Sequence, residues 1–497
     1  MKNRTLGQIR AATLLFPPLG LVWLWGSKDS RMGKKILGSF GIALYSLIYG
    51  GLLIFLMVKF AGMEVEFRGG YIPAFTFHKT RPDYQALEAN RRKQLTQSET
   101  RSNPSAQSSY WNGFRGPLRD GHYREQSIAT NWPKAGLQPV WHQPVGGGYA
   151  SFAIAAGRAF TIEQRREQEM AVAYDVGTGR ELWTQGWAAE FKEELGGDGP
   201  RATPAVDGER VYFLGALGEL RCLEAASGKQ IWRRNILDEN HAPVLAYGTA
   251  ASPLIVDDKV IVTPGGPNGH SVAAYSKTTG QPLWHAQNDE ASYSSPMEVN
   301  LAGQRHLLVI CEKRAIGLSL KDGALLWESP WIVQAGNRNI AQPLLLSSNR
   351  FFLSAGYGTG CAAVEITKEG ESLRAREIWR NNNLKNKFTS SVVSKGYIYG
   401  LDEDILVCLN AETGRREWKD GRYGYGQMLL ASEHLLILSG DGELALVPAR
   451  PTGWSELCRF PAIRGKTWNI PALGGGKLLV RNSFEMACFD LGSSAGQ

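Results

Sequence analysis

The sequence lacks the short motifs with which many enzymes hold a metal, a phosphate or a nucleophile. Its six cysteines stand singly, with no C-x-x-C and no adjacent pair, which excludes zinc ribbons and thioredoxin-like sites. Its eight histidines form no H-x-H, H-x-x-H or H-E-x-x-H, so we expect no metal ligands. No G-x-S-x-G occurs, and the Gly-rich stretches 356–361 and 421–426 precede no expected helix, which disfavours a phosphate loop. We therefore assign no catalytic residue.

A basic surface on the main body of the chain is also lacking. The formal net charge is +8, but residues 1–60 alone hold eight Lys or Arg against one acid. After residue 109 the chain has 40 basic and 41 acidic residues. A surface that follows phosphates has no support from this composition, so we expect no nucleic-acid partner.

Long apolar runs occur only near the N-terminus. Residues 36–58 are uncharged and mostly apolar, long enough to cross a hydrocarbon core of roughly 30 Å as a helix. The stretch 11–26 is shorter and contains Pro17 and Pro18, so it is either a second, kinked span or a segment lying in the membrane interface. We expect residues 1–60 to be a membrane anchor, a pair of buried core helices being the alternative.

The charges beside the strong span give its orientation. Lys28, Arg31, Lys34 and Lys35 precede it directly and should stay in the cytoplasm, which places the chain after residue 58 outside. This fails only if both spans form and the short basic loop is translocated. Residues 61–109 end in a Ser, Gln and Asn-rich run and are expected to be a partly disordered linker.

One phrase recurs along the rest of the chain: an apolar run, a Thr-Gly or Ser-Gly turn, and a strand with Trp. Its fullest form is AYDVGTGRELW at 173–183. The recurring tryptophans are 39 to 52 residues apart. Such a period with Gly-rich turns is typical of the four-stranded blades of a β-propeller. The turn and the Trp explain the phrase structurally: Gly takes a positive φ, and the indole is a large plate that packs on the next blade. The expected docking residues are Trp141, Trp183, Trp232, Trp284, Trp327, Trp379 and Trp418 with Gly179, Gly228, Gly280, Gly323 and Gly414.

The number of blades follows from the incomplete phrases. Residues 444–457 form a degraded seventh phrase, and residues 476–491 an eighth without its outer Trp strand. Residues 139–145 carry Trp141 without a preceding hairpin, so pairing 139–145 with 476–491 would close the ring and remove the open edges. We expect an all-β, eight-bladed propeller over residues 110–491, or seven blades if the degraded phrase does not pair.

The phrase A-x-D-x-x-T-G-x-x-L-W closely resembles the tryptophan-docking repeat of the pyrroloquinoline quinone (PQQ)-type β-propellers, and residues 110–151 resemble the start of bacterial PQQ-like repeat proteins. That superfamily contains quinoprotein alcohol dehydrogenases, which bind PQQ and calcium, and BamB-like assembly proteins, which carry no cofactor. The resemblance implies that the enzymes hold PQQ on the funnel axis under an indole and, in many members, over adjacent cysteines. This sequence has no such pair. Acids occur in one loop, which is more simply a solvated connection: Glu190, Glu193, Glu194 and Asp198.

The funnel mouth is the remaining candidate site. Amphipathic and hydrogen-bonding residues stand where the inner strands begin, and they could bind a peptide or small polar ligand, or line a water-filled channel. The candidates are Tyr149, Arg201, Tyr293, Asn339, Gln342, Lys387, Gln427 and Trp468, with their neighbours Ser151, Thr203, Thr249, Ser252, Ser294, Thr389, Tyr425 and Asn469.

The sequence thus favours a non-catalytic binding or scaffold protein of the bacterial cell envelope. It would be anchored in the inner membrane, with the propeller on the periplasmic side facing other envelope proteins. The alternative is a PQQ- and calcium-dependent quinoprotein dehydrogenase that oxidises an alcohol or sugar. The binding partner, the oligomeric state and the redox state of the cysteines stay open.

Overall fold

The computed structural model describes residues 6–26, 31–61, 63–66, 74–76, 82–96, 111–193, 196–370 and 372–492 of the 497-residue chain. The chain forms two compact units, Met1–Phe67 with Ile72–Lys79, and Arg68–Tyr71 with Thr80–Gln497. The expected linker residues 97–109, and Glu194 of the acidic loop, lie outside the described residues.

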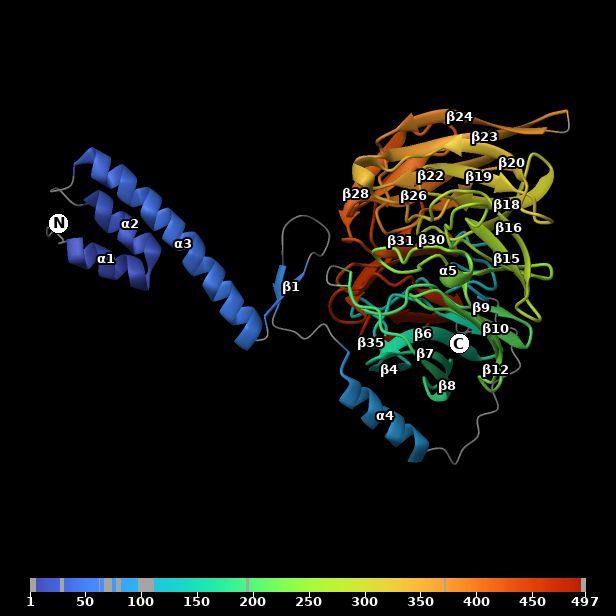
Figure 1. Ribbon diagram of the computed structural model, residues 1–497, viewed down its shortest axis with the longest axis horizontal. Helices are drawn as coiled ribbons and strands as arrows, with labels where there is room; N and C mark the ends of the chain where they lie inside the picture. The colour runs from blue at the N-terminus through green and yellow to red at the C-terminus, as the bar shows by residue number, and fades with distance from the viewer. Residues whose placement is uncertain are drawn as a thin grey trace. The chain divides into compact units, whose positions relative to one another are not determined.

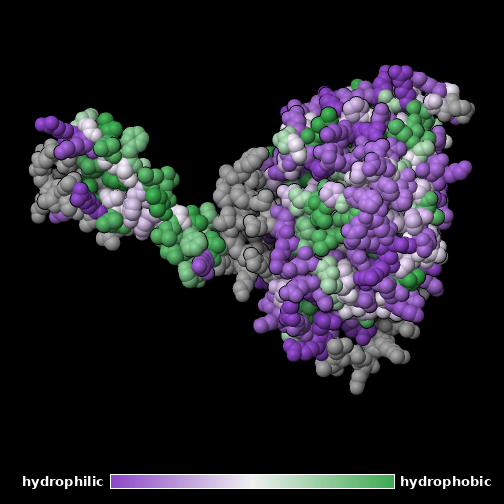
Figure 2. Space-filling view, viewed as in Figure 1, coloured by the Kyte–Doolittle hydropathy of each residue, from purple (hydrophilic) through white to green (hydrophobic). Residues whose placement is uncertain are grey.

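The first unit contains one helix long and apolar enough to cross a membrane, α3 (Met32–Phe60). Its apolar side chains are largely exposed, and Figure 2 shows the hydrophobic colour along it. The stretch 11–26 is not one helix: Phe16 separates α1 (Leu6–Leu15) from α2 (Pro17–Gly26). Each has ten residues and is about 15 Å long, half the thickness of a hydrocarbon core. A short hairpin of β1 (Glu64–Glu66) and β2 (Ala74–Thr76) completes the unit.

Within the first unit, α2 packs on α3 (Figure 1). The indole Nε1 of Trp25 donates to Ser39 Oγ at 2.9 Å. Ile9, Leu24 and Ile42 form a small buried cluster between the three helices. The 11–26 stretch therefore lies against α3 rather than standing alone.

The second unit is an eight-bladed β-propeller, which confirms the expected fold (Figure 1). Each blade is an antiparallel sheet of four main strands. Blades 1 to 4 follow one another along the chain: β5 (Ala153–Ala155), β6 (Arg158–Arg165), β7 (Gln168–Asp175) and β8 (Glu181–Ala188); β9 (Ala205–Asp207), β10 (Arg210–Leu214), β11 (Glu219–Glu224) and β12 (Gln230–Asn235); β13 (Leu254–Val256), β14 (Lys259–Val262), β15 (Val272–Ser276) and β16 (Pro282–Ala286); β17 (Met297–Leu301), β18 (Gln304–Ile310), β19 (Arg314–Leu318) and β20 (Leu325–Pro330).

Blades 5 to 8 complete the ring. They are β21 (Leu344–Leu345), β22 (Arg350–Ala355), β23 (Gly360–Glu369) and β24 (Ser372–Asn381); β25 (Val392–Ser394), β26 (Tyr397–Asp402), β27 (Ile405–Asn410) and β28 (Arg416–Arg422); β29 (Gln427–Ala431), β30 (His434–Leu438), β31 (Glu443–Pro448) and β32 (Cys458–Pro461), with β3 (His122–Tyr123) parallel to β29; and β33 (Ala472–Gly474), β34 (Lys477–Arg481), β35 (Glu485–Asp490) and β4 (Trp141–Pro144). The degraded seventh phrase does pair, because β31 and β32 are antiparallel neighbours.

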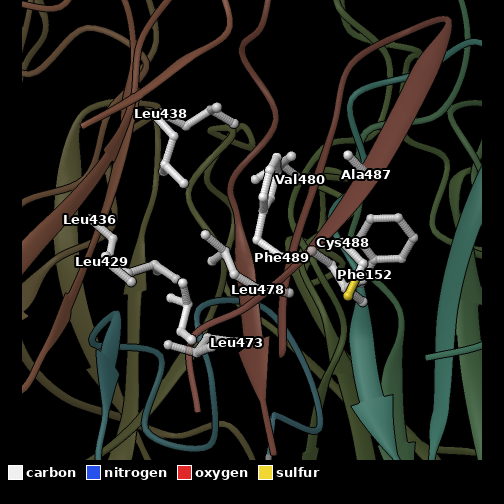
Figure 3. Packing of buried hydrophobic residues seen from close by; sticks show 14 of the residues in the cluster. Phe152, Leu429, Leu436, Leu438, Leu473, Leu478, Val480, Ala487, Cys488 and Phe489 are labelled. Carbon is white, nitrogen blue, oxygen red and sulfur yellow. The ribbon is translucent and has the colours of Figure 1, made fainter. Parts of the chain in front are cut away.

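Blade 8 joins the two ends of the propeller sequence. Its outer strand β4 pairs with β35, with Trp141 opposite Cys488. The core beside this blade is continuous: Phe152 of blade 1 lies next to Cys488, and Leu429 and Leu436 of blade 7 lie on the other side (Figure 3). Because blades pack on both faces of the middle strands, β10 and β34 are buried along almost their whole length.

The docking tryptophans contact the turns of the following blades. A Cβ atom at Gly179 would lie 2.7 Å from Trp141 Cδ2, and one at Gly228 2.5 Å from Trp183 Cε3, closer than atoms can pack. The same arrangement joins Trp232 to Gly280, Trp284 to Gly323 and Trp379 to Gly414. Where the indole reaches a carbonyl it donates to it, as Trp183 Nε1 does to Ala225 O at 3.0 Å.

Two of the seven tryptophans dock differently. Blade 5 has a long β23–β24 hairpin in place of the Thr-Gly turn, and Trp327 turns inward so that its Nε1 lies 2.8 Å from His306 Nε2. Trp418 keeps the hydrogen bond of the regular tryptophans, donating to Arg450 O at 2.9 Å, three positions before Gly453, but a Cβ atom at Gly453 would meet nothing within 4 Å. The outer strand of blade 7, β32, has no Trp, and Phe460 packs on Gly136 instead.

A helix occupies part of the expected linker. Residues 84–96 form α4 (Tyr84–Thr96), and its side chains bond to blades 1 and 8. Asp83 caps the helix by accepting from Gln85 N and Ala86 N. The sequence argument missed it because only Leu87 of the helix is deeply buried and the other contacts are polar. The remaining helical turns are α5 (Ile236–Glu239) and η1 (Gln334–Gly336).

Candidate functional site

A belt of hydrogen bonds joins the blades where the inner strands begin. In blades 1 to 6 a Ser, Thr or Gln stands two positions before the inner strand, and in blades 1 to 5 its backbone N–H donates to the matching side chain of the next blade. The bonds run from Ser151 N to Thr203 Oγ1 (3.1 Å), Thr203 N to Ser252 Oγ (2.9 Å), Ser252 N to Ser295 Oγ (2.9 Å), Ser295 N to Gln342 Oε1 (3.1 Å) and Gln342 N to Ser390 Oγ (3.0 Å). Between blades 8 and 1, Asn469 Nδ2 donates to Ala150 O at 3.0 Å.

Three of the eight mouth candidates belong to this framework. Gln342 takes part in the belt, and Gln427 Nε2 donates to Phe388 O at 3.2 Å. Asn339 is 1% exposed and bonds to Trp331 Nε1 and Ala341 O. These amides hold blades together, so the structure separates them from the other five candidates.

The other five lie at the mouth among further aromatic rings. Four positions before the inner strand stand Tyr149, Tyr293, Phe388 and Trp468, in line with the belt residues because side chains two apart in an extended strand share a face. Trp468 lies 5.8 Å from the Tyr149 ring and 4.7 Å from the Phe388 ring. Phe388 also contacts Tyr425 at 5.0 Å. We call Tyr149, Phe388, Tyr425 and Trp468 the aromatic cap.

Cations stack on the aromatic cap. Lys466 Nζ is 4.5 Å from the Trp468 ring centre, and Lys387 Nζ is 4.5 Å from that of Tyr425. The guanidinium of Arg201 is 5.6 Å from the Tyr149 ring. Burial lowers the pKa of Lys387 and of Arg201. Stacked aromatic and cationic side chains of this kind are the residues that dominate binding at protein interfaces.

Tyr293 lies beside an apolar loop on the same face. Its ring packs edge-on against Tyr247 at 5.8 Å, and its hydroxyl accepts from Tyr247 N. Tyr247 is 37% exposed and Val244 is 50% exposed. Exposed apolar side chains therefore border the mouth.

The opposite end of the axis is filled by residues 111–121, which we call the plug. Its backbone oxygens accept from inner strands: Trp111 O from Ile154 N at 2.6 Å and Asn112 O from Val206 N at 2.7 Å. Gly121 O accepts from Leu430 N at 2.8 Å. These eleven residues thus contact the inner strands of blades 1, 2 and 7.

Two buried arginines fasten the plug. Arg119 donates to the carbonyl oxygens of Ser252, Pro253 and Pro296. Arg115 Nη2 donates to Ser391 O at 2.7 Å and to Asp120 O. Burial lowers the pKa of Arg119 to about 9 and that of Arg115 to about 10, so both stay protonated at neutral pH. The sequence analysis missed both, because their partners are 133 to 276 positions away.

Some buried polar atoms around the axis have no partner within the described part of the chain. They include Trp468 Nε1, Ser294 Oγ, Gln427 Oε1 and Asn469 Oδ1. Buried polar atoms usually have a partner, so these donors and acceptors suit water or a polar ligand group.

The arrangement does not fit calcium. Calcium takes six to eight oxygen ligands, usually with several carboxylates. Among the described residues no group of three or more His, Cys, Asp or Glu could hold a metal ion. The charged side chains stacked on the cap are cations, and the two plug arginines add positive charge on the axis. We derive no oxidation step through PQQ from this donor set.

The acidic loop contributes to the mouth only structurally. Glu193 accepts from the backbone N–H groups of Gly196 and Gly197, and Asp198 accepts from Glu193 N. Glu190 pairs with Lys192 at 2.8 Å. These contacts shape the loop that carries Arg201.

The comparisons with known proteins agree with the fold. The family model described as "Outer membrane protein assembly factor BamB" matches residues 166–420. A curated protein of that description from Moranella endobia is 22% identical over 303 residues, covering 56% of this chain and 71% of its own. A quinohemoprotein alcohol dehydrogenase of Pseudomonas putida, ADH IIB, is 31% identical over 118 residues, which cover 23% of this chain and 16% of the enzyme.

Among solved structures, BamB from Moraxella catarrhalis aligns with a TM-score of 0.52 at 15% identity. It covers 73% of this chain and 100% of that one. At this identity the alignment shows the fold alone.

Proposed function

The chain belongs to the family described as outer membrane protein assembly factor BamB, and from this premise we propose that it is a non-catalytic docking protein of the bacterial cell envelope. The PQQ-like repeats and the eight-bladed ring are those of this superfamily. We also propose which surface docks, and that the chain functions without PQQ or calcium.

The observation that carries the proposal is the aromatic cap with its stacked cations. Trp468, Tyr149 and Lys466 form a partly exposed group on one face, beside the exposed Val244 and Tyr247. Rigid aromatic rings offer large contact area at low entropic cost, and stacked cations add direction. The cap is our proposed contact for another envelope protein.

A photo-crosslinking experiment tests this contact. The full chain would carry p-benzoylphenylalanine in place of Tyr247 at the mouth or, as the control, in place of Leu118 at the plug end, which is 57% exposed. We expect one defined adduct from position 247 that Trp468→Leu abolishes, and none of that size from 118. Equal adducts from both positions, or an adduct indifferent to Trp468, would argue against the cap.

We further propose that α3 anchors the protein in the inner membrane with the propeller on the periplasmic side. Its length and apolar surface support a span, and Arg31, Lys34 and Lys35 at its start favour a cytoplasmic N-terminal side. Protease added to intact spheroplasts should digest the propeller. Full protection would reverse this orientation.

The proposal includes function without PQQ or calcium. The donor chemistry at the mouth supports this, since the stacked groups are cations. The test is a titration of the full chain with PQQ and calcium, followed by absorbance and by dye-linked oxidation of alcohols and sugars. Saturable binding with turnover would establish the quinoprotein dehydrogenase in place of the docking protein.

A further inference from the structure

Helix α4 is held to the propeller by polar side chains at its C-terminal end. Arg91 Nε donates to Glu181 Oε1 at 2.7 Å. Asn90 and Gln94 both donate to Gln143 Oε1, and Gln94 Oε1 accepts from Glu181 N. These contacts span the seam between blade 8, which carries Gln143, and blade 1, which carries Glu181. Polar contacts of this kind are typical of interfaces that open and close.

A cleft borders the middle of the helix, although Leu87 is buried there and Glu88 pairs with Arg166 at 2.8 Å. A cleft of about 480 Å³ separates it from the β6–β7 hairpin, lined on the helix side by Tyr84, Leu87, Glu88 and Arg91. A helix of thirteen residues is marginal in water on its own. The helix therefore depends on docking, and apart from the packing of Leu87 its docking contacts are mostly polar.

The N-terminal end of α4 touches the mouth loop, residues 146–149. A Cβ atom at Gly147 would lie 3.5 Å from Pro82 Cγ. The Tyr84 hydroxyl is 3.5 Å from Gln164 O, the same oxygen that accepts from Gly147 N at 2.9 Å. Two residues further on is Tyr149, whose ring lies in the aromatic cap.

A second route runs through charged groups. From Arg91 the ion pairs continue to Glu181, then to Arg165 at 2.7 Å, then to the fully buried Glu163. Arg481, also buried, donates to Gly146 O at 2.9 Å and to Thr161 Oγ1. The mouth loop is thus held by Arg481 of blade 8 and, through Gln164 O, by strand β6, which Tyr84 of α4 also contacts.

We propose that α4 is a reversible clasp whose docking on the seam of blades 8 and 1 is coupled to the mouth loop. An occupant of the mouth that moves Tyr149 would change the docking equilibrium of α4, and undocking of α4 would loosen the mouth by the same factor, since coupling is reciprocal. The coupling is a property of the chain alone, so it stands or falls separately from the partner of the mouth.

Hydrogen exchange of the full chain in detergent tests the clasp. Arg91→Met removes the pair with Glu181, and Arg92→Met is the matched control, since Arg92 is the adjacent, exposed arginine. We expect amides of 84–96 to exchange at least tenfold faster in Arg91→Met only. Peptides over 145–151 should also exchange faster, while those of β30 and β31 stay unchanged.

The reciprocal measurement uses the mouth. Trp468→Leu removes the ring that holds Tyr149 and should speed exchange over 84–96 at least threefold. If Arg91→Met frees α4 without any change at 145–151, or Trp468→Leu leaves α4 untouched, the coupling is overturned. If α4 exchanges equally in both arginine variants, Arg91 does not hold the clasp.

Discussion

The two ends of the propeller axis carry the same sign of charge but hold it differently. At the plug end, Arg119 is 6% exposed and its N–H groups donate to three backbone carbonyl oxygens. At the mouth, Lys387 and Lys466 lie over aromatic rings and are partly exposed. Lys466 Nζ also donates to one backbone oxygen, Gly196 O, at 2.7 Å. A guanidinium holds its carbonyls in one fixed geometry, whereas an ammonium on a flexible stem can change partner when a group binds. The difference is consistent with a structural role of the plug end and with the docking role that we propose for the mouth.

The largest expected effect sharpens this comparison at the plug end. Arg119→Met leaves three buried carbonyls without a donor, and we expect the free energy of unfolding to fall by about 4 kcal/mol or more. Arg124→Met, three residues beyond the plug and half-exposed, should cost less than about 1 kcal/mol. Thermal melting of the full chain compares them. Equal melting temperatures for the two variants would show that Arg119 does not stabilise the fold through the plug.

The next effect tests how tightly the plug-side turns are packed. Gly228→Ala adds a Cβ atom 2.5 Å from Trp183, whereas Gly208→Ala meets nothing within 4 Å, and both glycines have positive φ. We expect about 2–4 kcal/mol of destabilisation at Gly228 and about 1 kcal/mol at Gly208. Urea unfolding measures both. Similar losses would mean that backbone strain alone, and not the indole, makes the turn need glycine.

The third effect lies on the mouth side, where a buried carboxyl titrates. Burial raises the pKa of Glu169 to about 7, although Ala216 N and Trp187 Nε1 donate to it. The folded chain then keeps a proton that the unfolded chain has lost, so this group makes stability fall as pH rises from about 4.5 to about 7.

Glu169→Gln should flatten that slope. Between pH 5 and 7.5 the parent chain should lose about 1–3 kcal/mol more than the variant, by urea unfolding at each pH. Glu167→Gln is the control, an exposed acid two residues away that should leave the slope unchanged. A slope retained in Glu169→Gln would assign the pH dependence to other groups.

The parts of the fold that repeat could be predicted from the sequence, and the parts that occur once could not. Trp183 and Gly228 recur in phrase after phrase, so their spacing alone indicates blades, and Trp141 without a hairpin indicates a shared sheet. Arg119 has no counterpart in the repeat, and its partners are brought near only by the closed ring.

The sequence indicates where each inner strand begins, but not which position there belongs to the belt and which to the aromatic rings. Sequence reasoning took Lys387 and Gln342 together, although Gln342 stands two positions before its inner strand, in the belt, whereas Lys387 stands five positions before its own, beside the ring position of Phe388. Phe388, which joins Trp468 to Tyr425, was missed for the same reason. The exact start of each inner strand decides this register, and strand ends are set by packing rather than by local sequence.

The smallest expected effect on stability is at the mouth, and it is the one that separates fold from function. Lys387→Met keeps the apolar stem but removes the charge over Tyr425, which should cost less than about 1 kcal/mol. Crosslinking from position 247 should nevertheless fall several-fold, because the cation belongs to the proposed contact. Lys313→Met, at an exposed lysine away from the cap, should change neither quantity. If Lys387→Met destabilises the chain as much as Arg119→Met does, the mouth cations are structural like those of the plug, and the contrast between the two ends disappears.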